Sequence, residues 1–130
     1  MLSLEEIKNE VDRLASIINV PLKLLPTYGY SDDFARPYID VNSRGYHFII
    51  VERGEELQHK ITQELDVLLY WIFEGITFSM AANYEFNNRI ENVDSRWTIF
   101  KKQEELLAAL NKIWQQKQIE VHRRLLKGYS

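Results

Sequence analysis

The stretch that decides the fold is DVLLYWIFEGITFSMAANYEFNNR, which runs from Asp66 to Arg89. It has the length of a helix, and apolar side chains occupy almost every side of it. A helix that is hydrophobic all round belongs inside a domain, so we predict a buried central helix. One stripe at helical spacing holds Leu65, Leu68, Leu69, Ile72, Ile76 and Met80. Aromatic side chains fill the remaining sides: Tyr70, Trp71, Phe73, Phe78 and Tyr84.

The composition predicts one domain that covers residues 1–130. Of the 130 residues 45% are hydrophobic, which is enough for a sizeable core. The longest uninterrupted apolar run, Val67 to Phe73, is far shorter than the roughly 18 residues of a membrane span. Met1 to Pro21 is acidic and amphipathic, unlike a signal peptide. We therefore expect a cytoplasmic protein without a membrane partner. Because the sequence has no cysteine, disulfides, thiolate nucleophiles and cysteine-based metal sites are excluded.

Charge is distributed unevenly along the chain, whose net charge is −3. Residues 1–66 contain 12 acidic and 7 basic residues, whereas residues 67–130 contain 7 acidic and 9 basic ones. A nucleic-acid surface would need a denser basic face with interleaved aromatic side chains, so we expect no nucleic-acid partner. Much of the basic excess instead complements the dipole at the end of the last predicted helix: Lys112, Lys117, Arg123, Arg124 and Lys127.

The N-terminal segment predicts an amphipathic helix. Ser3 and Glu6 have the spacing of a capping box, and Pro21 ends the helix because the residue before a proline avoids helical angles. Its buried stripe consists of Leu4, Ile7, Val11, Leu14 and Ile18. The following segment, 22–36, reads as a connection, to which residues 22–25 can add a short strand.

Strand signals dominate the next segment. Tyr38 to Val41 and Tyr46 to Glu52 are rich in β-branched and aromatic residues, and Asn42 to Gly45 supplies a turn between them. Glu56 to Ile61 alternates polar with less polar residues, as a half-exposed strand does. The sequence therefore predicts an α+β fold with a three-stranded antiparallel meander between the N-terminal helix and the buried central helix.

A long C-terminal helix is predicted from Ser95 to Lys127. Its roughly 33 residues would span about 50 Å at 1.5 Å per residue. A compact domain of 130 residues has a diameter of about 36 Å, so one straight helix does not fit within it. We predict that the helix bends or breaks near Asn111; the alternative is an overhang whose exposed apolar face binds another chain.

No residue pattern in the chain carries recognisable catalytic chemistry. His47, His59 and His122 are far apart and outside any metal-binding motif, so we predict no metal and no cofactor. Glu74 is the one candidate acid or base, because its neighbours at helical spacing are mostly aromatic, but no second acid accompanies it. A structural role for Glu74 is the favoured interpretation. A small hydrolase or transferase that uses Glu74 in a pocket stays as an alternative.

Several blocks of the sequence together resemble the immunity protein 63 family of bacterial polymorphic toxin systems. The resemblance extends over roughly residues 25–114, although a basic residue is usual in the family where this chain has Trp97, and the family's proline near Asn111 is absent. The blocks are LPTYG (25–29), PYIDV (37–41), GYHFIIVERG (45–54), DVLLYWIFE (66–74) and TFSMA (77–81), with Tyr84, Glu85, Arg89, Asp94, Arg96, Phe100, Gln103, Glu105, Leu106 and Leu107. The resemblance implies a non-enzymatic cytoplasmic protein that binds and neutralises a cognate toxin.

A toxin inhibitor needs a surface that combines charged and aromatic side chains, because charge speeds encounter and buried aromatic anchors carry affinity. The long connection before the predicted hairpin offers both kinds of side chain. We predict the partner-binding residues Tyr28, Tyr30, Asp32, Asp33, Phe34 and Arg36. In the alternative interpretation this is an ordinary loop whose aromatic side chains fold back onto the sheet, with Asp32 and Asp33 as turn formers. A structural or regulatory module that associates with itself is a further alternative, and the sequence leaves the oligomeric state open.

Overall fold

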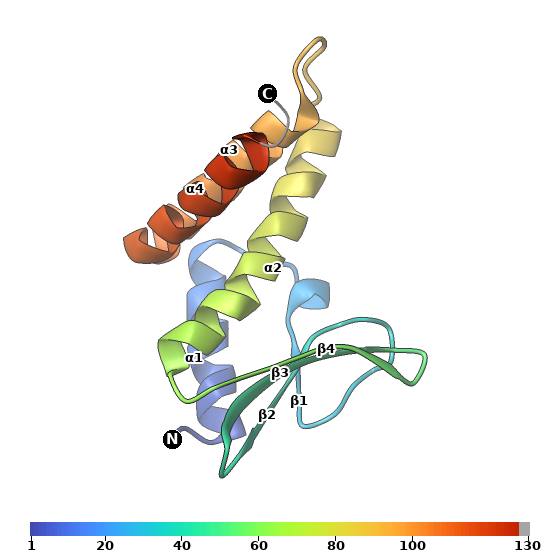
Figure 1. Cartoon of the computed structure of the whole chain (residues 1–130), viewed down its shortest axis with the longest axis vertical. Helices are drawn as coiled ribbons and strands as arrows, with labels where there is room; N and C mark the ends of the chain where they lie inside the picture. Colours follow the sequence, from blue (N-terminus) through green and yellow to red (C-terminus); the bar gives the residue numbers. More distant parts are fainter. Residues whose placement is uncertain (128–130) are drawn as a thin grey trace. The chain divides into compact units, whose positions relative to one another are not determined.

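The computed structural model describes residues 1–127 and has an α+β fold (Figure 1). Within these residues lie four α-helices, one short 3₁₀ helix and a four-stranded mixed sheet. The chain divides into two compact units, residues 1–73 and residues 74–130. Helix α2 (Leu65–Asn87) begins in the first unit and continues into the second.

The first unit opens with the predicted capping box and helix. In α1 (Leu4–Ile17) the Ser3 hydroxyl accepts from the Glu6 backbone N–H, while the Glu6 carboxylate accepts from the Ser3 N–H. The helix buries Ile7, Val11, Leu14 and Ala15. After Pro21 the chain forms the 3₁₀ helix η1 (Leu22–Leu24). The prediction of a short strand in residues 22–25 is therefore wrong. Leu24 N and Leu25 N instead donate to the carbonyl oxygens of the residues three positions earlier in the chain, which is the 3₁₀ pattern.

The sheet has strand order β1-β2-β3-β4 and corrects the three-stranded prediction. The expected antiparallel meander is present as β2 (Tyr38–Asn42), β3 (Gly45–Glu52) and β4 (Glu55–Thr62). The fourth strand, β1 (Thr27–Tyr28), pairs with β2 in parallel. Two residues are too few for a period-2 pattern, and the pairing depends on hydrogen bonds from Thr27 N to Pro37 O (3.0 Å) and from Gly29 N to Ile39 O (2.8 Å). The predicted turn before β3 uses Gly45 at φ +134°, where an added Cβ would lie 2.6 Å from the Thr62 carbonyl oxygen.

The core of the first unit lies between α1, the sheet and the start of α2. Its fully buried side chains include Ile7, Val11, Ile39 and Leu68. The Lys60 ammonium lies over the rings of Phe48 and Trp71, at 5.1 Å and 4.5 Å from their centroids, so β4 covers aromatic surface with its lysine stem. Apart from that, most of β4 is exposed.

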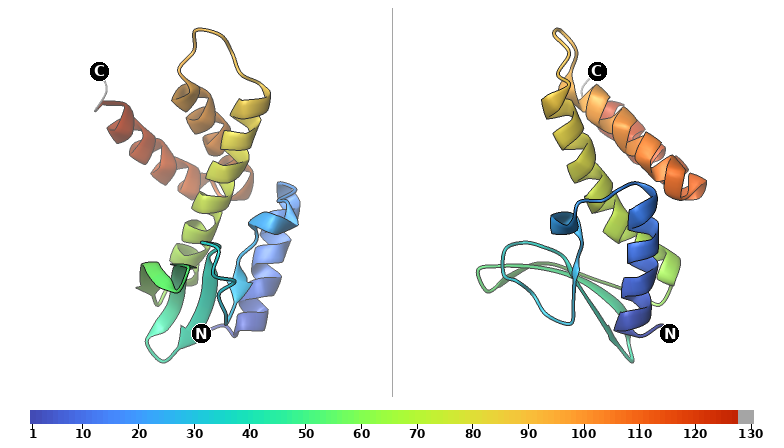
Figure 2. Two further views of the ribbon diagram at one scale, coloured as in Figure 1. Left: turned by 90° about the vertical axis from the view of Figure 1, so that its right-hand side faces the viewer. Right: turned by 180° about the vertical axis from the view of Figure 1, so that it is seen from behind.

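The second unit consists of the rest of α2, α3 (Ser95–Leu110) and α4 (Lys112–Lys127). The predicted break near Asn111 is confirmed: this residue is extended, at φ −167° and ψ 115°. Its side chain accepts from the backbone N–H groups of Ile113 (2.9 Å) and Trp114 (3.2 Å) and so caps α4. Helices α3 and α4 pack against each other (Figure 2).

Helix α2 is less completely buried than its sequence predicts. Leu68, Leu69, Ile72 and Phe73 are buried, but Phe78 and later aromatic residues are exposed. In the described part of the chain, Leu65–Asn87 is the one helix long and apolar enough to cross a membrane by length and composition. The prediction from the sequence counted only uninterrupted apolar residues, whereas the mean hydropathy of an 18-residue window in this helix tolerates isolated polar ones. Within the window concerned, 44% of the residues are buried by the chain itself, and the core helix of a soluble protein passes the same test.

Candidate partner-binding surface

Five of the six predicted residues lie on a loop, residues 29–36, that is hydrogen-bonded to the turn between β3 and β4, whereas Tyr28 lies in β1. Asp33 makes most of this attachment, since its carboxylate accepts from Gly54 N (2.7 Å) and its carbonyl from Arg53 N (3.2 Å). Ala35 N donates to Val51 O at 3.0 Å, and Phe34 forms an isolated antiparallel bridge with Glu52. The 29–36 loop thus extends one edge of the hairpin.

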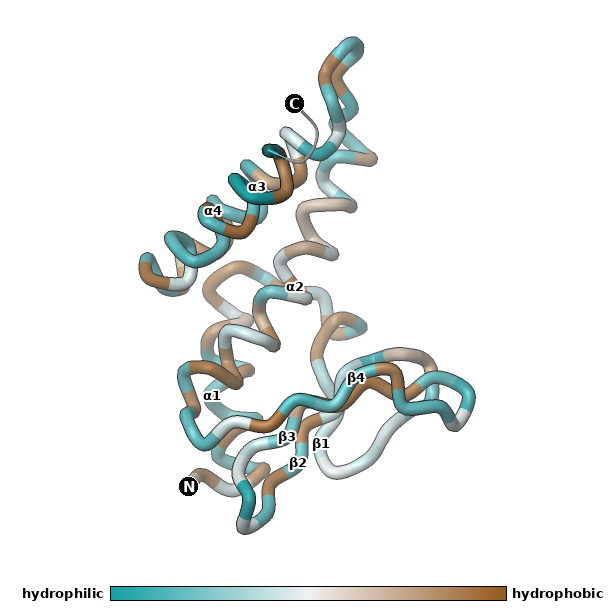
Figure 3. Tube along the Cα trace, in the orientation of Figure 1, coloured by the Kyte–Doolittle hydropathy of each residue, from teal (hydrophilic) through white to brown (hydrophobic). Residues whose placement is uncertain are grey.

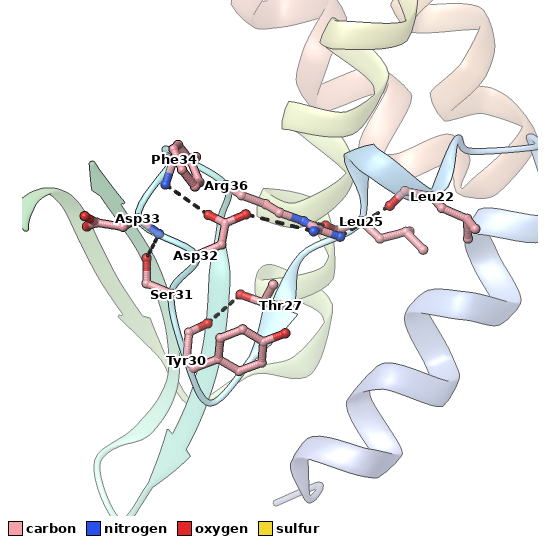
Figure 4. Close-up of polar contacts among 9 residues, drawn as sticks. All are labelled: Leu22, Leu25, Thr27, Tyr30, Ser31, Asp32, Asp33, Phe34 and Arg36. Carbon is pink, nitrogen blue, oxygen red and sulfur yellow. Dashed lines mark hydrogen bonds and ion pairs between the residues drawn. The ribbon is translucent and has the colours of Figure 1, made fainter. Parts of the chain in front are cut away.

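Local hydrogen bonds also hold the 29–36 loop internally (Figure 4). Asp32 Oδ1 accepts from Phe34 N at 3.0 Å, and Ser31 Oγ accepts from Asp33 N at 2.9 Å. These are turns in which a short side chain replaces a backbone acceptor. Asp32 therefore acts as a turn former, as the alternative interpretation of this segment expected, whereas the Asp33 carboxylate bonds Gly54 N in the β3–β4 turn.

Arg36 connects the 29–36 loop to the 3₁₀ helix. Its guanidinium donates to the carbonyl oxygens of Leu25 and Leu22, the latter at 3.3 Å, and lies 4.0 Å from Asp32 Oδ2 (Figure 4). The Thr27 hydroxyl in β1 donates to the Tyr30 carbonyl oxygen at 2.5 Å, a hydrogen bond that connects β1 to the 29–36 loop. The charge of Arg36 is thus directed inward, toward backbone acceptors.

Of the six predicted residues, Tyr30 and Phe34 present the largest exposed apolar surfaces, with exposed fractions of 63% and 84%. Tyr28 is half-buried, and its hydroxyl oxygen is buried with no hydrogen-bond partner among the described residues 1–127. Burial, followed by the charge of Asp12, raises the pKa of Tyr28 well above its ordinary value. The six residues lie on one connected segment, but their side chains do not converge on one point.

Residues with positive φ concentrate in this region. Five of the eight described residues with positive φ belong to the loop or the adjoining turn: Gly29, Asp33, Ala35, Arg53 and Gly54. Ala35 at φ 64° lacks the local hydrogen bonds that ease this conformation for aspartate. Strained positions of this kind persist only where the surrounding structure determines them, and they cluster at ligand-binding segments. The positive φ values of Asp33, Ala35 and Arg53 indicate that the surrounding structure holds this loop in one conformation.

A pair of histidines on the hairpin was not anticipated from the sequence. His47 Nδ1 lies 2.8 Å from His59 Nε2, and His47 Nε2 lies 2.9 Å from Asn42 Oδ1. His59 Nδ1 lies 3.2 Å from Glu56 Oε1. Burial, followed by the charge of His59, lowers the pKa of His47. The register of the β3–β4 hairpin could have indicated this pair, because it makes positions 47 and 59 diagonal neighbours on one face of the sheet.

A second polar cluster, in the second unit, joins three helices. His122 Nδ1 lies 2.6 Å from Glu104 Oε2, and its Nε2 lies 3.0 Å from Gln103 Oε1. Gln103 Nε2 donates in turn to the Glu74 carbonyl (3.0 Å) and to Thr77 Oγ1 (3.3 Å). Phe100 stacks on the His122 ring at a centroid distance of 3.9 Å. No sequence motif pointed to these positions, because the partners are 18 to 29 positions apart.

The described residues hold no group of three or more His, Cys, Asp or Glu side chains that could bind a metal ion. Glu74, the one candidate acid or base, is half-buried, and its backbone carbonyl accepts from Gln103. The 29–36 loop presents two exposed aromatic side chains, Tyr30 and Phe34, on a hydrogen-bonded backbone.

A family model described as Immunity protein 63 matches residues 42–124, well over half of the chain. No curated protein and no solved structure matches the chain.

Proposed function

The chain belongs to the Immunity protein 63 family, and we propose that it binds and neutralises a cognate toxin domain without catalysing a reaction. The observation that carries the proposal is the family match over residues 42–124. The proposed setting is the cytoplasm of a bacterium that makes the toxin as part of a polymorphic toxin system, or meets it from neighbouring cells. Neutralisation would then depend on how tightly the chain binds the toxin and on which part of the toxin surface it covers.

The 29–36 loop is the proposed first contact with the toxin. Phe34 and Tyr30 are exposed aromatic side chains, the type that most often supplies binding energy at interfaces. Because the loop is braced by Asp33 and Arg36, little conformational entropy is lost when it is buried. The first unit carries 12 acidic and 7 basic residues, so a basic toxin surface would be attracted to it.

The first testable prediction concerns protection of cells. The toxin domain encoded beside this gene should arrest growth when it is expressed alone, and co-expression of this chain should restore growth. The two proteins should also co-purify. A toxin of unrelated sequence, expressed with the same chain, is the control and should stay lethal. Growth arrest that persists although the chain is present and folded would contradict the proposal.

A further inference from the structure

A second exposed aromatic surface lies in the second unit, where α2 ends and α3 begins. The five apolar side chains there have exposed fractions between 40% (Val93) and 72% (Phe86), and the others are Tyr84, Ile90 and Trp97. The connection between the two helices is visible at one end of both in Figure 2, and its hydrophobic positions interrupt a hydrophilic segment in Figure 3. Exposed apolar side chains grouped in this way mark interaction sites more often than isolated ones do.

Four of these five side chains, all except Phe86, line an open groove of about 300 Å³, which we call the aromatic groove. Trp97 and Lys101 also line a neighbouring groove of about 290 Å³ between α3 and α4, so they form the ridge between two hollows. A ridge flanked by hollows can insert into a partner while the hollows receive its side chains. The lining of the aromatic groove includes Tyr84, Ile90, Val93, Trp97, Lys101 and Lys102.

The aromatic groove is braced in the unbound chain. Glu85 and Arg89 form two hydrogen bonds of 3.1 Å each at the end of α2. Asp94 caps α3 by accepting from the Arg96 backbone N–H, and its carboxylate pairs with the Arg96 guanidinium at 2.6 Å. Both ends of the connection are therefore fixed, which lowers the entropy lost when a partner binds.

Two lysines fix the aromatic rings and set the charge of the aromatic groove. Lys101 Nζ lies 4.8 Å from the Trp97 ring centroid, and Lys102 Nζ lies 4.6 Å from that of Tyr84. One acid, Glu105, also lines the groove and lies 3.5 Å from Lys102. The lining thus has two cations and one anion. The second unit as a whole has 9 basic and 7 acidic residues, opposite in sign to the first unit.

We infer that the aromatic groove is a docking site for an acidic segment of the toxin that carries an apolar anchor side chain. The apolar anchor would occupy the hollow beside Trp97, and carboxylates next to it would meet Lys101 and Lys102. The inference rests on the proposed function, since it names part of the same partner. All six lining residues named above lie within residues 42–124, the matched region, whereas Tyr30 and Phe34 precede it.

The test compares matched variants in binding to the purified toxin domain encoded beside this gene. Trp97→Ala should raise the Kd at least about tenfold, as the loss of an aromatic hot spot does. Ile113→Ala removes an exposed apolar side chain of α4 outside the aromatic groove and should leave the Kd within about twofold. Lys101→Glu should weaken binding more than Lys112→Glu, which changes the net charge equally, and this difference should shrink at high salt.

The outcomes separate the two claims. Unchanged affinity of both Trp97→Ala and Lys101→Glu, with thermal unfolding showing folded variants, would overturn the docking site while leaving the proposed function standing. Absence of binding by the unaltered chain would overturn the proposed function and the docking site together. Because Trp97 and Lys101 are both exposed, neither substitution removes a core side chain.

Discussion

At the scale of single residues, a buried polar side chain, Gln103, connects the helices of the second unit by hydrogen bonds. Gln103 is fully buried and joins α2 to α4, because its amide donates to the Glu74 carbonyl while its oxygen lies 3.0 Å from His122. A buried polar group is costly unless it is hydrogen-bonded, so this residue selects one arrangement of the helices of the second unit. Glu74 contributes only its backbone carbonyl to the network, so the structural role predicted for its carboxylate stays a prediction.

The histidine pair on the hairpin leads to a prediction of pH dependence. Because burial and His59 lower the pKa of His47 in the folded chain, the unfolded chain binds a proton at higher pH than the folded one. The stabilising contribution is complete above the ordinary histidine pKa of about 6.5 and is lost as the pH falls below it. Asp40, which opposes the shift, and Arg44, which reinforces it, are the other charged groups that act on His47.

The measurement is the free energy of unfolding in urea between pH 7.5 and 5, for the unaltered chain and for His47→Gln. One proton contributes at most about 1.4 kcal/mol per pH unit. The free energy of unfolding should fall more steeply with decreasing pH for the unaltered chain than for the variant. The difference between the two slopes should be a fraction of this maximum. Parallel curves for the two proteins would refute the assigned role of His47.

At the scale of elements, the sequence predicted those helices, strands and breaks that have a recognisable signal in the chain. The α1 capping box, the β2–β3 hairpin and the break near Asn111 were all predicted, since each has a local signal or, for the break, a helix too long for the domain. Strand β1 was missed because its two residues carry no periodicity. The 3₁₀ helix was also missed; Arg36, fourteen positions from Leu22, donates to the Leu22 carbonyl, which accepts one of the two hydrogen bonds of this helix.

The link between η1 and the 29–36 loop gives an element-scale prediction. Arg36→Ala removes the donors to the Leu22 and Leu25 carbonyls and should lower the free energy of unfolding by about 1–2 kcal/mol. Amide hydrogen exchange in residues 22–36 should speed up. Arg44→Ala, an exposed arginine in the β2–β3 turn, is the control and should change stability by less than about 0.5 kcal/mol. Equal effects of the two substitutions would show that Arg36 does not brace the loop.

At the scale of the whole molecule, the sequence predicted one exposed surface of aromatic and charged side chains, and its role as the toxin interface stays a prediction. Exposed aromatic side chains beside charges were predicted in the 29–36 loop, where the structure exposes Tyr30 and Phe34. The aromatic groove was not predicted, since Tyr84 was assigned to a side of the buried central helix but is 41% exposed. Periodicity identifies which residues share a side of a helix, but only tertiary packing decides whether that side is covered.

Titration calorimetry of the purified chain with the purified toxin domain encoded beside its gene tests the central claim most directly. Neutralisation inside a cell requires a complex that persists at low concentration, so we expect saturable binding with a Kd of nanomolar order, about −12 kcal/mol. The toxin's activity should disappear at the same molar ratio at which binding saturates. A folded chain that gives no saturable binding at tens of micromolar toxin would contradict the account.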